Sequence, residues 1–174
     1  SIADKIIVFI KEIVGDFTGG LAIAAIAVAV FWGAVSGSTV ATVAAIGIIL
    51  IPGMVKSGYD KPFATAVISV ASGLAIIIPP SITFILYAVV TGTSVGALFA
   101  GGFIPGFVIA AFLMGSAYLT SKKRGYRGER RTNGIKGVLK AGADAFWALL
   151  TPVVILGGIY GGIFTPTEAA AVAC

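Results

Sequence analysis

The sequence contains no histidine and a single cysteine, so two common sources of protein chemistry are missing. The lone Cys174 excludes a disulfide framework and a cysteine metal site within this chain. The serines have no base to activate them, because histidine is absent and no lysine lies inside an apolar run. No phosphate-binding loop of the Walker type occurs either. These absences argue against an enzyme.

Charge is also scarce. Only 11% of the 174 residues are charged, 58% are hydrophobic, and the mean hydropathy is +1.07, which is unlike a soluble globular domain. Residues 17–55, 62–121 and 145–167 carry no charge at all. A spanning helix needs roughly 20 apolar residues. The sequence therefore predicts an all-α integral membrane protein with several segments embedded in the lipid bilayer.

The basic residues are concentrated in one stretch. Eight of the twelve lie between Lys122 and Lys140. A short membrane-flanking loop explains this cluster better than a nucleic-acid surface does, so we expect no nucleic-acid partner. The positive-inside rule places the loop, residues 121–140, on the cytoplasmic side. An additional contact with lipid headgroups stays open.

Polar residues divide the first half of the chain. Residues 1–16 predict an amphipathic interfacial helix or the end of a truncated span. Within residues 17–55, two apolar runs, 21–35 and 39–51, are each too short to cross comfortably at about 1.5 Å per residue. We therefore predict a re-entrant helical hairpin with its tip at residues 36–39. Two complete but short spans are the alternative that segment length leaves open.

A second break is predicted in residues 62–91, a transmembrane helix interrupted by Pro79 and Pro80. Each proline lacks an N–H group and clashes with the preceding turn. The carbonyl groups of residues 75–78 then lose their usual partners, which is tolerated at membrane depth only inside protein or beside a cavity. Residues 95–120 predict the return crossing. This topology puts the basic loop on the same side as four other basic residues, Lys5, Lys11, Lys56 and Lys61.

Residues 145–174 predict a further transmembrane segment and the start of the next helix. The glycines at 157, 158, 161 and 162 have small-xxx-small spacing, which indicates either a packing face for a second helix or a flexible joint. Thr165 and Glu168 have the spacing of a capping box. Because Glu168 is also an acid in an apolar stretch, a functional role for Thr165, Thr167 and Glu168 is the alternative.

The two breaks leave hydroxyl groups, glycines and freed carbonyl groups, which are hard oxygen donors suited to a small alkali cation. At residues 36–39, the C-terminal end of the first half-helix carries partial negative charge, which attracts a cation. The N-terminal end of the second half-helix has free N–H groups, which can bind an anion. Gly37 and Thr39 are thus candidates for substrate contact. Ser36 and Ser38 are equally compatible with simple helix caps.

Three motifs occur in order: SGSTVATVAAIGIILIP, ASGLAIIIPPSITFILYAVV and GGIYGGIFTPTEAAAVA. Together they resemble the large membrane subunit of the tripartite ATP-independent periplasmic (TRAP) transporters over nearly the whole chain. The resemblance implies inverted repeats with helical hairpins that move as an elevator, and this chain would be a piece of the longer subunit.

The resemblance also implies a function. It implies sodium-coupled symport of an organic acid, such as sialic acid or a C4-dicarboxylate, by a multi-pass protein of the bacterial inner membrane. The implied partners are a small membrane subunit, separate or fused, and a soluble periplasmic binding protein. A passive channel and a scaffolding membrane subunit are the alternatives.

For Na⁺, the resemblance implies donors at both breaks: Ser36, Ser38 and the backbone carbonyl groups of Ala75, Ile78 and Pro80. The family commonly has glycine where this chain has Ala75. If that position needs a positive φ, the alanine costs roughly 1 kcal/mol or shifts its carbonyl group.

Overall fold

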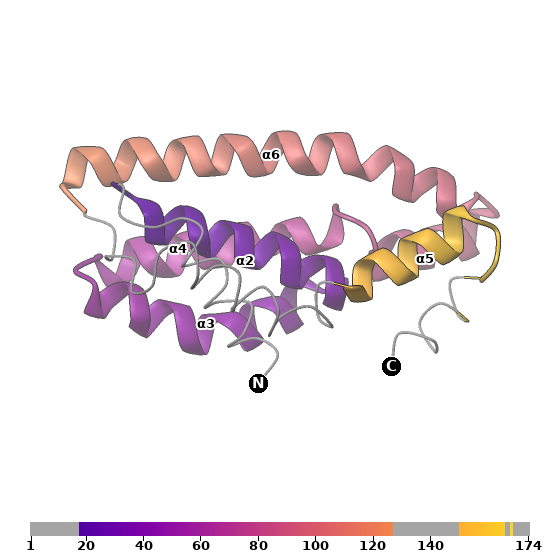
Figure 1. Ribbon diagram of the computed structural model, residues 1–174, viewed down its shortest axis with the longest axis horizontal. Coiled ribbons are helices and arrows are strands. Elements are labelled where there is room, and N and C mark those ends of the chain that lie inside the picture. Colours follow the sequence, from indigo (N-terminus) through magenta and orange to yellow (C-terminus); the bar gives the residue numbers. More distant parts are fainter. Residues whose placement is uncertain (1–17, 127–149, 166–167, 169–174) are drawn as a thin grey trace.

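The computed structural model describes residues 18–126, 150–165 and 168, and their regular elements are all helices (Figure 1). In chain order they are α2 (Gly20–Ser36), α3 (Thr39–Lys56), α4 (Lys61–Ser72), the 3₁₀ helix η1 (Gly73–Ile76), α5 (Ile82–Thr91), α6 (Val95–Arg124) and an apolar helix at Leu150–Tyr160. The predicted all-α class is confirmed for this part of the chain. Several predictions fall outside the described residues: residues 1–16, residues 127–140 of the basic loop, Thr167, and residues 145–149 and 169–174 of the last predicted segment.

Two helices, α3 and α6, are long and apolar enough to cross a membrane. Only 28% of the apolar window of α3 and 22% of that of α6 are buried inside the protein. The core helix of a soluble protein would be mostly buried. The large apolar side chains on the outer face of α6, such as Ile104 and Phe112, are instead exposed, as lipid contact requires.

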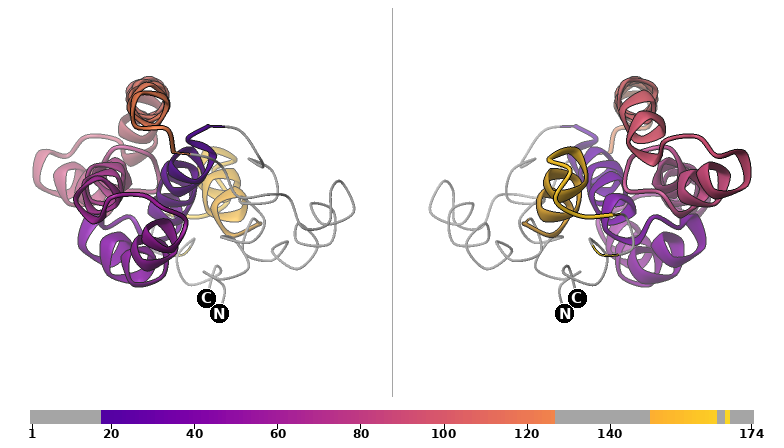
Figure 2. Two further views of the ribbon diagram at one scale, coloured as in Figure 1. Left: turned by 90° about the vertical axis from the view of Figure 1, so that its left-hand side faces the viewer. Right: turned by 90° about the vertical axis from the view of Figure 1, so that its right-hand side faces the viewer.

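Helix α2 is the centre of the packing. It contacts α3, α4, α6 and η1, and Figure 2 shows these helices gathered around it in end-on views. Half of its buried residues are alanines, and Ala22, Ala25 and Ala29 are completely buried. Because their side chains are small, the neighbouring helices approach α2 closely.

The two helices of the hairpin are longer than the sequence predicts. Helix α2 has 17 residues and α3 has 18, and α3 continues through Pro52 to Lys56. At 1.5 Å per residue, each is about 26 Å long. Their length therefore does not distinguish a re-entrant hairpin from two spans.

Hydrogen bonds and ring contacts join the turn between α3 and α4 to the end of α6. The Asp60 carboxylate accepts hydrogen bonds from the Tyr126 hydroxyl (2.6 Å) and the Arg124 guanidinium (2.7 Å). The Arg124 guanidinium also lies 5.7 Å from the ring centroid of Phe63, and the ring of Tyr59 packs against Tyr126. We call these five residues the basal clasp. It brings the basic turn beside the basic end of α6, as the topology argument predicts.

The basal clasp predicts a pH dependence of stability. The Tyr126 hydroxyl, followed by Arg124, lowers the pKa of Asp60. Since the pKa falls on folding, the contribution of Asp60 is fully present above the usual value of about 3.9 and is lost as the pH drops through the lower folded value. We expect Asp60→Asn to lower the melting temperature of the intact protein in detergent slightly at pH 7, because both charged groups are half-exposed.

The same variant should approach the wild type only at pH values below the lowered pKa of folded Asp60, where the carboxyl group is protonated in both states. Tyr126→Phe removes one donor but keeps the charge pair, so we expect a smaller effect at pH 7. An equal loss for Asp60→Asn at both pH values would contradict the assignment.

Candidate functional site

Two residues reverse the chain at the hairpin tip. Gly37 ends α2 with φ at +62°, and its N–H group donates to the Gly33 carbonyl at 2.7 Å. This is the left-handed helix stop for which glycine is favoured. Ser38 is extended, and its hydroxyl accepts from the Ala41 N–H group at 3.5 Å as the N-cap of α3. Ser38 therefore caps α3, which agrees with the helix-cap alternative for this residue.

The oxygen atoms of the tip form a compact network. The hydroxyl oxygens of Ser36 and Thr42 lie 2.8 Å apart. Both also lie within hydrogen-bond distance of the Ser38 carbonyl oxygen, at 3.2 and 2.8 Å. A hydroxyl group has one proton but two lone pairs. The Ser36 hydroxyl also accepts from the Ser38 N–H group at 3.3 Å, so one of its lone pairs remains for a cation when the Thr42 proton points to the Ser38 carbonyl oxygen.

The second break separates η1 from α5. The Ser81 hydroxyl donates to the Ile76 carbonyl at 2.8 Å, which replaces one lost helical bond. Among the described residues, no group donates to the carbonyl oxygens of Ala75, Ile78 or Pro80. The structure thus contains the freed backbone oxygens that the two prolines predict.

The tip and the break are in direct contact. The N–H group of Ile82 donates to the Gly37 carbonyl at 3.3 Å. A Cβ atom on Gly37 would lie 3.1 Å from the Pro80 carbonyl oxygen, and one on Gly33 would lie 2.9 Å from Cα of Ala75. The predicted residues of α2 and of the break therefore meet at one junction.

Ala75 occupies its position without backbone strain. It lies in η1, and every non-glycine residue of the described part has a negative φ. The penalty considered for an alanine with positive φ does not arise. The methyl group of Ala75 is accommodated because Gly33 faces it without a side chain.

A cavity of about 130 Å³ lies at the junction. Ser36, Gly37 and Pro80 line it, together with Ser81 and with apolar side chains from α5, α6 and the Leu150–Tyr160 helix. Ser38, Ala75 and Ile78 lie at the tip or the break but not on the cavity wall. The five proposed sodium donors thus divide between the cavity and its surroundings.

Sequence reasoning missed two buried polar residues, Ser81 and Ser72, and gave Thr39 only as a candidate for substrate contact. Ser81 is fully buried and begins α5, and its position directly after two prolines was a signal for an N-cap. The hydroxyl oxygens of Thr39 and Ser72 are buried and have no hydrogen-bond partner among the described residues. An unsatisfied buried hydroxyl costs about 1–3 kcal/mol. Thr39, so far a candidate only for substrate contact, and Ser72 are therefore further candidates for ligand binding.

The available donors are of one chemical type. No group of three or more Asp, Glu, Cys or His side chains that could hold a metal ion occurs in the described part of the chain. The oxygens at the junction belong instead to hydroxyl and carbonyl groups. This donor set fits an alkali cation and not a transition metal, which prefers nitrogen or sulfur ligands.

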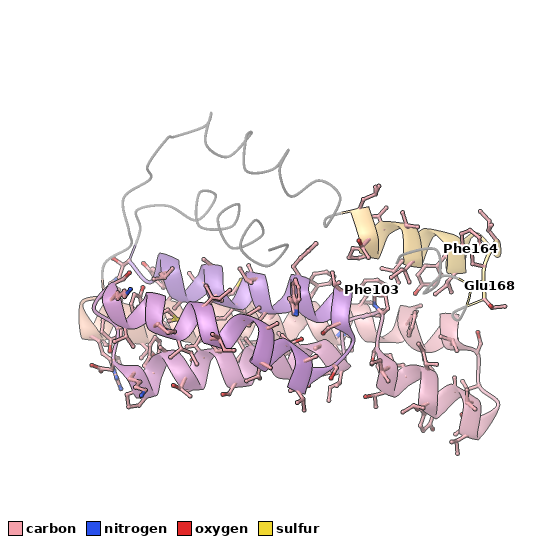
Figure 3. The ribbon with its side chains drawn as sticks, turned by 90° about the horizontal axis from the view of Figure 1, so that it is seen from below. Phe103, Phe164 and Glu168 are labelled. Atoms are coloured by element: carbon pink, nitrogen blue, oxygen red, sulfur yellow. The ribbon has the colours of Figure 1, made fainter. Side chains whose placement is uncertain are left out.

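Thr165 and Glu168 form the predicted capping box. The Glu168 carboxylate accepts from the N–H and hydroxyl groups of Thr165, both at 2.8 Å, and the Glu168 N–H group donates to the Thr165 hydroxyl at 3.3 Å. Figure 3 shows Glu168 near Phe164, beyond the end of the Leu150–Tyr160 helix. The geometry supports the capping interpretation of both residues.

The predicted glycine packing face does not continue along one helix, because Gly161 and Gly162 lie beyond its end, and the alternative of a flexible joint stays a prediction. The helix ends at Tyr160, and Gly162 has φ at +66° in the turn that follows. The N–H groups of Gly162 and Ile163 donate back to the carbonyl groups of Ile159 and Gly158, which is a Schellman stop. The Phe164 ring occupies the space beside Gly158 that a second helix would need.

Comparison with known proteins places this arrangement in a family. The model of the tripartite ATP-independent periplasmic transporter, DctM component, matches residues 1–174. A C4-dicarboxylate TRAP transporter large permease protein of Vibrio cholerae is 50% identical over 172 residues, which are 99% of this chain and 38% of that protein. An isethionate TRAP transporter permease protein of Oleidesulfovibrio alaskensis is 49% identical over 162 residues, 93% of this chain and 26% of that protein.

A sialic acid TRAP transporter permease protein of Haemophilus influenzae is 36% identical over 173 residues, 99% of this chain and 28% of that protein. The chain spans less than half the length of these relatives. All three are named as permeases, which points to a membrane protein with a role other than that of an enzyme. The resemblance found in the three sequence motifs is thus confirmed, and the chain belongs to the DctM-component family of the tripartite ATP-independent periplasmic transporters.

Proposed function

We propose that this chain is part of a permease that couples sodium entry to uptake of a small organic acid across the bacterial inner membrane. The three relatives described above are named for isethionate, C4-dicarboxylates and sialic acid, which are all organic anions. A periplasmic binding protein delivers the substrate, and a small membrane subunit, separate or fused, completes the complex. The isethionate relative, named DctMQ, suggests the fused form.

The observation that supports the sodium site is the contact between the tip and the break. Ser36 and Pro80 line one cavity, and Ala75 lies against Gly33 of α2. The C-terminal end of α2 adds negative dipole for a cation. The N–H groups at the start of α3, beside Gly37 and Thr39, are suited to the acid group of the substrate.

The level of the junction along α6 supports a re-entrant hairpin. Gly102 of α6 adjoins the Ile77 carbonyl, and Gly106 adjoins the Ile78 side chain. These glycines lie about 10 to 17 Å along the helix from Val95. If α6 spans the bilayer, the freed carbonyl groups lie at membrane depth, where only a protein cavity tolerates them. In our proposal the hairpin and the break move together as part of an elevator.

The sodium assignment predicts the effect of removing the tip hydroxyls. We expect Ser36→Ala and Ser38→Ala each to raise the sodium concentration for half-maximal uptake about tenfold or more, because a hydrogen-bond-type contact to a charged group contributes about 1.5–3 kcal/mol. The measurement is uptake of a labelled C4-dicarboxylate into liposomes that hold the intact transporter, with its binding protein and an inward sodium gradient.

Ser94→Ala is the matched control. Ser94 also caps a helix, accepting from the Ala97 N–H group at 3.4 Å, but it lies in the exposed link before α6. The Ser94→Ala variant should lose about as much capping energy as the tip variants, but its uptake should keep the sodium dependence of the wild type. An unchanged sodium dependence in both tip variants would refute the assignment. Saturable uptake that needs neither sodium nor the binding protein would instead support a passive channel.

A further inference from the structure

The Leu150–Tyr160 helix supplies one wall of the junction cavity. Ile155 and Ile159 both line the cavity, together with Ser36, Pro80 and Ser81. Residues four apart lie on the same face of a helix. Ile155 is only 9% exposed, whereas Val153 on the opposite face is 63% exposed. The helix therefore has an inward face directed at the cavity and an outward face directed away from it.

Ile155 and Ile159 add to an apolar part of the lining that also contains Ile82, Ile85 and Phe99. The lining also contains Ser36, Pro80 and Ser81, which belong to the hairpin tip and the proline break. Hydrocarbon side chains cannot coordinate a cation, but they can keep water away from one. At a share of about 30 Å³ per liquid water molecule, the cavity has room for about four waters, so its hydration depends on how well it is closed.

The end of this helix is held in place independently of the cavity. The Schellman stop at Gly162 and the Phe164 ring beside Gly158 define where the helix ends. Figure 1 shows the helix, in yellow, beside the end of the hairpin formed by α2 and α3. The chain thus brings a defined apolar surface against the two breaks from a segment remote in sequence.

We propose that Ile155 and Ile159 form an apolar cover that excludes water from the junction cavity. Under the proposed function, this exclusion strengthens the attraction between the oxygens and sodium, because charges interact more strongly where water is absent. The two residues are positioning residues, since they act on the ion through the environment of its ligands. The hydrophobic shell around an ion site commonly has this effect.

Cysteine labelling tests the cover directly. Ile85 lines the same cavity from α5, so Ile85→Cys serves as a reporter in an intact transporter without other cysteines. In liposomes, we expect Ile155→Ala and Ile159→Ala to speed labelling by a water-soluble methanethiosulfonate about tenfold. The sodium concentration for half-maximal uptake should rise about tenfold with little change in the maximal rate.

Matched variants separate the cover from general damage. Val153→Ala removes a side chain from the outward face of the same helix and should leave both quantities unchanged. Ile155→Val and Ile159→Val, which preserve more of the fold, should give values between those of the wild type and the alanine variants. Equal labelling rates in the wild type and both alanine variants would overturn the cover. The cover would also be overturned if Val153→Ala changed the labelling rate and the sodium dependence as much as Ile155→Ala and Ile159→Ala do.

The outcome also distinguishes the cover from sodium coupling. If uptake by the wild type is independent of sodium, the proposed function fails, and the labelling rates still decide whether the isoleucines exclude water. If labelling becomes faster while the sodium dependence stays the same, the link between the cover and ion affinity is refuted.

Discussion

Alanine at Gly37 is expected to destabilise the protein by about 2–5 kcal/mol and to abolish most uptake, whereas alanine at Gly92 costs only about 1–2 kcal/mol. Both glycines end a helix in the left-handed region, with φ at +62° and +69°. Both substitutions therefore carry the same backbone strain. Only at Gly37 does the new methyl group meet other atoms, 3.1 Å from the Pro80 carbonyl oxygen and from the Ile82 nitrogen.

The additional loss of stability in Gly37→Ala, compared with Gly92→Ala, measures how closely the hairpin tip packs against the proline break. A Cβ atom at Gly92 has no neighbour within 4 Å, so the difference between the two variants removes the shared strain. The measurements are the melting temperature in detergent and sodium-driven uptake by the intact transporter. Equal losses in the two variants would mean that the tip does not depend on close approach to the break.

Alanine at Gly102 is expected to destabilise the protein, and alanine at the adjacent Gly101 to leave it unchanged or stabilise it by up to about 1 kcal/mol. Both positions lie inside α6, so both gain the same helix propensity from the substitution. At Gly102 the methyl group would collide with the Ile77 carbonyl oxygen and the Phe84 ring, while at Gly101 nothing lies within 4 Å. Overpacking of this kind costs about 1–3 kcal/mol or more.

The two variants are expected to change the stability in opposite directions, so they can be distinguished clearly. The collision would push α6 away from the freed carbonyl groups, so we also expect lower sodium affinity in Gly102→Ala and wild-type affinity in Gly101→Ala. Melting temperatures and sodium titrations of uptake check the two expectations. If Gly102→Ala is as stable as Gly101→Ala, α6 does not pack on the break as closely as the structure indicates.

Local sequence was sufficient for features that short-range chemistry controls. Pro79 and Pro80 lack N–H groups in any context, so the break and its freed carbonyl groups could be predicted. The same holds for the Ser-Gly-Ser tip and for the capping box of Thr165 and Glu168. Helix lengths were less predictable, because the caps and not the ends of the apolar runs set the helix boundaries. Gly37 ends α2, and α3 runs from its N-cap Ser38 to its C-cap Ser57.

Glycine spacing shows the limit of a local pattern. The glycines at 157, 158, 161 and 162 have the spacing of a helix-packing face, but that pattern assumes that the helix continues. The chain turns after Tyr160 and folds Phe164 onto Gly158. Spacing cannot reveal this, since glycine favours both a close helix contact and a helix stop.

The sequence by itself determined the class of the protein: its scarce charge requires burial in lipid, and its two helix breaks require a cavity for unpaired oxygens. Only the tertiary structure decided which groups share that cavity. Ser36 and Pro80 line it with Ser81, and Ile155 and Ile159 close one side. These residues are up to 123 positions apart along the chain. Their meeting depends on how α2, the break and the Leu150–Tyr160 helix pack in space, and no local pattern encodes that distance.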